Sequence, residues 1–201
     1  MNAHPALIDL VRERQGPRHP GYAALRRACD DVRRMADVLA QGVDPDSTDP
    51  EGATLLHVSD LPLGVVQLLL AAGADADVPW YTGHGRTPLF FATKQGVPTA
   101  LFQSGADLES RDNDGLTPLL FNIQHGAVAV VRELLTLGAE ITAQDAAGLD
   151  VFDYASLYPD ARIRERMNTV LRSHHQAWVK RAGLMAIVSP RSETAAVPRR
   201  L

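Results

Sequence analysis

The segment 112–115 has, at first sight, the residue types and spacing of a metal site. It reads Asp-Asn-Asp-Gly, as at the start of a calcium-binding loop. Such a loop also needs later oxygen ligands and a closing glutamate that binds through both oxygens. The sequence supplies neither after Gly115. We therefore expect no metal site here, and nothing elsewhere in the chain indicates a cofactor.

Nucleophilic or zinc-dependent chemistry has no better candidates. Cys29 is the single cysteine, and a catalytic thiol would need an activating base and an open site. His174 and His175 are adjacent and have no third ligand at a helical spacing. The chain also lacks a phosphate-binding glycine loop after a strand, a Gly-x-Ser-x-Gly elbow and a His-Glu-x-x-His motif. We predict that it is not an enzyme.

The elements that carry these residues recur along the chain. A helix start of the Thr-Pro-Leu type recurs at intervals of 33, 30 and 33 residues, at Thr54, Thr87, Thr117 and, as Asp-Val-Phe, Asp150. A second series recurs at intervals of 31, 32 and 33, at Gly42, Gly73, Gly105 and Gly138. Two series with one period indicate a repeat protein.

Local chemistry explains the repeating pattern. A Thr before Pro caps a helix, because its hydroxyl accepts an orphan backbone N–H and Pro suits the first helical position. Glycine after an apolar run supplies a left-handed stop. One helix pair is too small to bury its own apolar face, so neighbouring pairs must stack.

These residues resemble the ankyrin repeat, with its Thr-Pro-Leu-His-x-Ala, Gly-Ala-Asp and Asp-x-x-Gly signatures. The resemblance covers residues 21–160, about four repeats and a partial closing one, although Thr82 stands where an Asp is expected. It implies an all-α solenoid of stacked helix pairs with hairpin fingers. It also implies a structural role for His57, which occupies the histidine of the motif.

Both ends are expected to differ from the repeats. Residues 1–20 predict an N-terminal capping helix, over 5–14, and a linker; a short partner-binding helix is the alternative. Residues 161–182 predict a C-terminal capping helix with a polar outer side. Residues 183–201 are expected to form a flexible tail.

One finger is longer than the others. Gly73 to Thr87 spans 14 positions, against 12 in the other three fingers, and the insertion carries Trp80 and Tyr81. Trp, Tyr and Arg often dominate binding energy at interfaces, but Trp80 could equally fold back and fill a gap. The candidate partner-binding residues on fingers and first helices are Trp80, Tyr81, His84, Arg86, Phe91, Lys94, Arg111, Asn113, Asp114, Asn122 and His125.

Composition sets outer limits on the class of protein. The chain has 201 residues, of which 45% are hydrophobic and 22% charged, as in a soluble globular protein. A single cysteine suits a reducing compartment, and no apolar run is long enough to cross a bilayer. The start has no signal-peptide pattern, so we expect a cytoplasmic protein. Usage rich in Arg and poor in Lys suggests a bacterial source.

The net charge of −4 conceals an uneven distribution. Residues 35–160 carry 4 Lys/Arg and 18 Asp/Glu, or −14; residues 161–201 carry 9 and 2, or +7; residues 1–34 carry 7 and 4, or +3. Many of the acids are explained by the repeat turns. The alternative is an acidic surface that attracts a basic partner by long-range steering.

These observations favour a protein–protein interaction module that holds a partner in a concave groove between fingers and first helices. A more specific alternative is a bacterial inhibitor, immunity or chaperone-type protein that neutralises one effector or enzyme. Nucleic-acid binding through the basic C-terminal arm is a third class, which the acidic body opposes. The sequence leaves the oligomeric state open.

Overall fold

The computed structural model describes residues 21–80 and 82–188, where the chain forms ten helical elements and no strand. In chain order these are α2 (Tyr22–Ala28), α3 (Val32–Ala40), the 3₁₀ turn η1 (Leu55–His57), α4 (Leu63–Ala71), the 3₁₀ turn η2 (Pro88–Phe91), α5 (Val97–Gln103), α6 (Pro118–Gln124), α7 (Val128–Leu137), α8 (Val151–Leu157) and α9 (Ala161–Val188). The expected all-α fold is confirmed.

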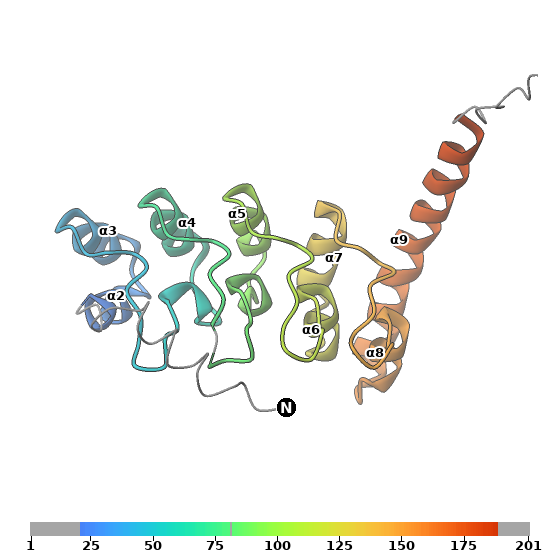
Figure 1. Ribbon diagram of the computed structural model, residues 1–201, viewed down its shortest axis with the longest axis horizontal. Coiled ribbons are helices and arrows are strands. Elements are labelled where there is room, and N and C mark those ends of the chain that lie inside the picture. Colours follow the sequence, from blue (N-terminus) through green and yellow to red (C-terminus); the bar gives the residue numbers. More distant parts are fainter. Residues whose placement is uncertain (1–20, 81, 189–201) are drawn as a thin grey trace, which may run out of the picture.

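The elements are arranged in two rows (Figure 1). The first row holds α2, η1, η2, α6 and α8, and each of these contacts the next. The second row, α3, α4, α5, α7 and α9, is built in the same way. Within a repeat the two rows pack together, as α6 does with α7. The chain is therefore a solenoid whose core lies between the rows and between successive repeats.

The first elements of two repeats are shorter than we expected. The sequence predicts full helices after Thr54 and Thr87, but η1 and η2 are single 3₁₀ turns. The reason lies in repeat length. From the threonine to the glycine stop there are 21 positions in the fourth repeat (117–138), but 19 in the second (54–73) and 18 in the third (87–105). In the second repeat the missing residues come from the first-row helix and the turn that follows it, whereas in the third repeat the second-row helix α5 is shortened as well.

The threonines confirm the capping prediction only in part. The Thr117 hydroxyl accepts the Leu120 N–H at 3.3 Å, as expected. The Thr87 hydroxyl instead faces the Ser110 hydroxyl of the next finger, at 3.1 Å. Thr54 bonds to His57, whose Nδ1 lies 3.0 Å from its hydroxyl. Thr54 therefore still caps its own turn, through His57, whereas Thr87 joins its turn to the next finger.

The glycine series ends the second-row helices as predicted. Gly138 follows α7 with φ 110°, and Gly73 follows α4 with φ 96°. A side chain would be strained at such angles, and glycine is not. The chain then reverses into the next finger. We define the fingers as residues 42–54, 73–87, 105–117 and 138–150; they lie on the side of the first row (Figure 1).

Carboxylates join one finger to the next. Asp46 accepts the Asp75 N–H at 3.0 Å, Asp77 accepts the Asp107 N–H at 3.1 Å, and Glu109 accepts the Glu140 N–H at 2.7 Å. Partial burial raises the pKa of Asp77 and of Glu109 above their ordinary values. Three of the 18 acids of residues 35–160 therefore serve to align the fingers.

A carboxylate of the fourth repeat caps a helix of the third. Glu133 on α7 accepts the Gly96 N–H at 2.9 Å and the Thr99 N–H at 3.0 Å, at the start of α5. It also accepts the Thr99 hydroxyl at 2.6 Å. Gly96 has a left-handed backbone and no side chain to act as a cap, so a residue from the next repeat satisfies the exposed N–H groups.

We expect Glu133→Ala to lower the free energy of unfolding by about 2 kcal/mol, because it leaves two helix N–H groups of a half-buried site without their acceptor. Urea unfolding followed by circular dichroism measures the change. Thr136→Ala, at an exposed position of the same helix, is the control and should stay within about 0.5 kcal/mol. Equal stability of the two variants would contradict the capping role.

The two ends differ from prediction at one point. The expected N-terminal capping helix lies in residues 1–20, outside the described residues. The C-terminal helix was expected to end at 182, but α9 continues to Val188. The expected flexible tail therefore begins too early, because Gly183 sits within the helix without ending it. Cys29 is buried at 2% exposure and packs in the core, as expected for a structural cysteine.

Candidate partner-binding surface

Four aromatic rings follow one another across three repeats. Trp80 lies 6.0 Å from Phe91, Phe91 lies 6.3 Å from Phe121, and Phe121 lies 4.1 Å from His125, measured between ring centroids. We call these four residues the ring row. Its first three rings are half-buried and His125 is exposed, so the chain itself covers this aromatic surface only in part.

Trp80 starts the ring row and is held by the preceding finger. Its indole N–H donates to the Glu51 carbonyl at 3.1 Å, and the Thr82 hydroxyl donates to the same oxygen. Its ring also lies 6.0 Å from that of His57. Packing against the previous repeat thus buries part of the Trp80 side chain, and the rest of the side chain remains exposed. Tyr81, its expected companion, lies outside the described residues.

His57 is a buried residue whose ring lies next to that of Trp80. It is 5% exposed, its Nδ1 faces the Thr54 N–H at 3.2 Å, and its Nε2 lies 3.0 Å from the Val78 carbonyl. These partners require Nδ1 to accept and Nε2 to donate, which is a neutral imidazole with its proton on Nε2. Burial lowers the pKa of His57, in agreement with that state. The residue fastens the long finger to η1, a structural role.

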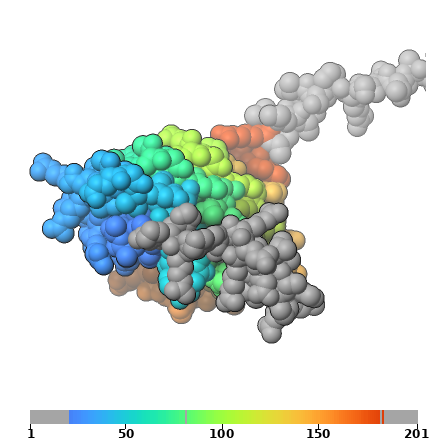
Figure 2. Space-filling view, turned by 60° about the vertical axis from the view of Figure 1, so that its left-hand side comes forward, coloured from blue at the N-terminus to red at the C-terminus, as the bar shows by residue number. Residues whose placement is uncertain are grey.

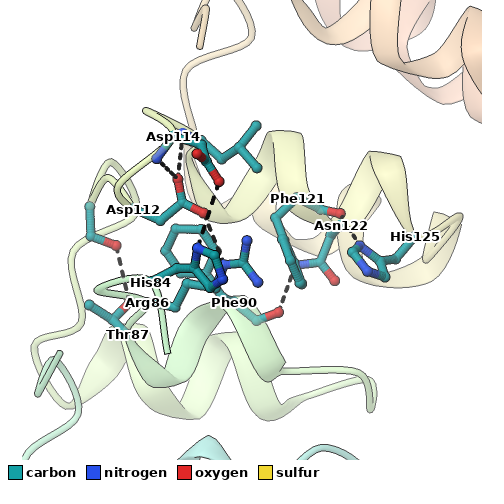
Figure 3. A network of polar contacts seen from close by, with 11 residues as sticks. His84, Arg86, Thr87, Phe90, Asp112, Asp114, Phe121, Asn122 and His125 are labelled. Carbon is teal, nitrogen blue, oxygen red and sulfur yellow. Dashed lines mark hydrogen bonds and ion pairs between the residues drawn. The ribbon is translucent and has the colours of Figure 1, made fainter. Parts of the chain in front are cut away.

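Arg86 is the second cross-finger link, and it is largely enclosed (Figure 3). Its Nε donates to Asp112 at 2.9 Å, and its guanidinium carbon lies 4.5 Å from the centroid of the Phe121 ring. The Asp112 side chain is fully buried and also accepts the N–H groups of Asp114 and Leu116, at 3.0 and 2.9 Å. This carboxylate is saturated by the protein, which explains why the segment 112–115 does not offer it to a metal.

His84 and Asp114 face each other at the tips of adjacent fingers. The His84 Nδ1 lies 3.9 Å from the Asp114 carboxylate, and the two side chains are 61% and 64% exposed (Figure 3). Asn113 is exposed beside them, and its N–H donates to the His84 carbonyl at 2.9 Å. The structure brings these three candidates together at one accessible edge.

Two further cations among the candidates are exposed and already engaged. Lys94 is exposed and lies 3.9 Å from the Asp60 carboxylate, which also accepts the Thr93 hydroxyl. Arg111 is exposed and donates to the carbonyls of Gly115 and Gln144, at 2.8 and 2.6 Å. Both side chains are accessible at the surface, yet each also holds neighbouring segments of the chain together.

One predicted partner-binding residue is buried. We expected Asn122 near the groove, but it is 2% exposed. Its amide donates to the Pro118 carbonyl at 2.9 Å and reaches the Phe90 carbonyl at 3.5 Å (Figure 3). Its neighbours Phe121 and His125 do reach the surface. A polar residue on a first-row helix can thus be used entirely inside the stack, and the sequence pattern does not distinguish the two cases.

Phe121 was not among the candidates, although it is the central ring of the row. The adjacent pair Phe90 and Phe91 was expected to divide between core and groove, and it does: Phe90 is 1% exposed and Phe91 half-buried. Phe121 lies one repeat after them, and the same argument applied to Leu120 and Phe121 would have found it. Leu120 is fully buried and Phe121 is not.

The ring row offers little room to a small ligand. A crevice beside the ring row, lined by Leu61, Phe91, Lys94 and their neighbours, has an open volume of about 10 Å³, room for one water molecule. Among residues 21–80 and 82–188 no three His, Cys, Asp or Glu side chains are placed to hold a metal ion. In the same part of the chain no helix has the length and apolar character needed to cross a membrane.

Comparison with known families agrees with the repeat pattern. Residues 58–145 match the family model described as ankyrin repeats, in three copies. A neurogenic locus notch homolog protein 1 of Xenopus tropicalis is 33% identical over 129 residues, which are 61% of this chain and 5% of that protein. Palmitoyltransferase AKR1 of Lachancea kluyveri is 30% identical over 125 residues, 59% of this chain and 17% of the transferase. The match spans only a small part of each relative.

Proposed function

Because this chain is an ankyrin-repeat protein, we propose that it holds a partner protein on the ring row and the adjacent finger tips. Ankyrin repeats are protein-interaction modules, and they show the class of function without naming a partner. The observation that supports this particular surface is the ring row, Trp80, Phe91, Phe121 and His125, which crosses three repeats and is only partly covered. Half-buried aromatic rings are the side chains most often found as interface anchors.

The charge around the ring row favours a basic partner. Residues 35–160 carry 18 Asp/Glu and 4 Lys/Arg. Two of the four cations lie beside carboxylates: Arg86 is paired with Asp112, and Lys94 lies beside Asp60. The field at the fingers is therefore negative, and it would speed the encounter with a positively charged surface. A buried free cysteine, Cys29, suits the reducing interior of a cell, where we place this function.

The relatives give no reason to assign a reaction to this chain. One is a palmitoyltransferase by name, but the shared stretch is 17% of that protein. In the described part of this chain the polar side chains near the ring row are hydrogen-bonded to the protein itself, as Asp112 and Asn122 are. We propose a binding role without catalysis.

The surface is tested by removing accessible groups that carry little of the fold. We expect His125→Ala with Asp114→Ala to weaken capture of the partner at least about tenfold, since both side chains are exposed at the edge of the ring row. The measurement is affinity capture from the source organism's lysate, read by mass spectrometry, and then titration with the purified partner. Gln67→Ala with Gln103→Ala, exposed on the second row, is the control and should capture normally.

The same purified partner separates two kinds of binding protein. A scaffold leaves the partner's own activity intact, whereas an inhibitor or immunity protein abolishes it at one-to-one stoichiometry. If the His125 and Asp114 double variant captured the partner normally and the control variant did not, the partner would bind to the second row instead. Correct folding of each variant is checked by its thermal unfolding curve.

A further inference from the structure

The C-terminal half of α9 extends beyond the stack it closes. The helix has 28 residues and is about 42 Å long, whereas the other described helices have at most 10 residues. It packs on α7 and α8 through Leu171, its last fully buried residue, and then through His175, whose ring lies 5.8 Å from that of Phe152 on α8. Figure 1 shows the C-terminal end of α9 projecting from the end of the stack, and Figure 2 shows that end behind the repeats, on the far side from α2 and α3. We call residues 176–188 the projecting half.

The projecting half presents apolar and basic side chains together. Trp178 and Val179 are 47% and 49% exposed, and Lys180 and Arg181 follow them directly and are exposed. The Trp178 ring is stacked on that of His175 at 6.0 Å, which fixes it on the helix surface. From Arg166 to Val188 the sequence contains four Lys/Arg and no acid. A surface that covers this helix must therefore combine apolar groups with negative charge.

The chain itself carries such a surface. The ring row provides partly exposed aromatic groups, and Glu51 and Asp114 are exposed acids on the fingers beside it. Within one molecule the two surfaces do not meet: α9 occupies the last position of the second row and points away, while Phe91 and Phe121 lie on η2 and α6 of the first row (Figure 1). The basic end of the helix and the acidic finger tips can therefore come into contact only between two molecules.

We propose that the projecting half of α9 docks on the ring row and fingers of a second copy of this chain. The contact joins Trp178 and Val179 to the rings, and Lys180 and Arg181 to the finger carboxylates. Two copies that exchange their helices in this way make the contact twice, which gives a closed dimer. Pairing of two α9 helices with each other is disfavoured, because both are basic. The dimer does not require a foreign partner, so it is tested on the purified chain alone, and its outcome is independent of the capture experiment.

The test is the sedimentation equilibrium of the full chain at low and high salt. We expect dimers that dissociate at least about tenfold more readily at about 0.3 M than at about 0.03 M salt, because the contact joins opposite charges. Lys180→Glu with Arg181→Glu, and separately Glu51→Lys with Asp114→Lys, should each give monomers. Arg27→Glu with Arg33→Glu changes the net charge as much as the helix variant does, at exposed positions of the first repeat, and should remain dimeric.

Mixing the two monomeric variants decides the matter. Their inverted charges are complementary, so an equimolar mixture should form heterodimers, and Trp178→Ala in the helix variant should weaken them. A wild-type chain that is monomeric at low salt overturns the proposal. Dimers that tighten with salt would instead indicate apolar pairing of the α9 helices, and a mixture that stays monomeric would also contradict the docking.

Discussion

Asp112→Ala is expected to cost about 3–5 kcal/mol of unfolding free energy, the range for removing one member of a buried ion pair. The Asp112 side chain is fully buried and accepts from Arg86 and from the Asp114 and Leu116 N–H groups. Its loss leaves a guanidinium that is 19% exposed without its counter-charge, and two turn N–H groups without an acceptor. The free energy of unfolding of a whole domain is about 5–15 kcal/mol, so this variant should be close to unfolding at 37 °C.

A graded series separates the parts of this effect. Asp112→Asn keeps one oxygen for the turn but presents an amide to Arg86, and it should fall between wild type and Asp112→Ala. Asp114→Ala removes an exposed acid two residues away, whose ion pair with His84 is 3.9 Å long, and it should change stability by less than about 0.5 kcal/mol. The measurement is urea unfolding at neutral pH. A cost below about 1 kcal/mol for Asp112→Ala would show that the turn reorganises without the carboxylate.

His57→Ala is expected to be the second most costly change, at about 2–4 kcal/mol. The imidazole is enclosed between Thr54 and Val78, and the rings of Trp80 and Phe91 lie 6.0 and 5.9 Å away. Truncation leaves a cavity under the long finger and removes the link between that finger and η1. His125→Ala removes an exposed histidine of the ring row. It serves as the control and should have little effect on stability.

The contribution of His57 depends on pH, in a direction that follows from its pKa. Burial lowers that pKa in the folded chain, so as the pH falls the unfolded chain, with histidine pKa values near about 6.5, takes up the proton first. The stabilisation is therefore complete above the unfolded value and is lost as the pH falls below it. The difference in stability between wild type and His57→Ala should shrink between about pH 7.5 and pH 5. A difference in stability that is constant over this range would show that the pKa of His57 is the same in the folded and the unfolded chain.

Both changes act on the surface that we propose as the binding site. Arg86 and His57 lie beside the ring row: His57 fastens the long finger to η1, and Arg86 fastens it to the next finger. Loss of partner binding in such variants would therefore not identify a contact. This is why the binding test uses His125 and Asp114, whose side chains are exposed and whose removal leaves these links in place.

The repeat architecture was predictable from the sequence because it depends on local chemistry repeated at one period. Threonine before proline starts a helix, glycine after an apolar run ends it, and four copies of the pattern leave few other folds. The same local rules placed Cys29 and Phe90 in the core and His84, Asn113 and Asp114 at an accessible edge. For these residues position in the repeat determines burial, so no knowledge of the neighbouring repeat was needed.

Tertiary structure alone decided how each polar or aromatic side chain is used. Asn122 is internal because it meets carbonyls of its own helix and of Phe90, and Arg86 is enclosed because Asp112 and Phe121 come from the next repeat. Glu133 caps a helix 34 residues earlier in the chain. Such partners are set by how neighbouring repeats stack, which the sequence of one repeat does not specify. A pattern that is local along the chain therefore determines the solenoid, while contacts between repeats determine which of its side chains remain available to a partner.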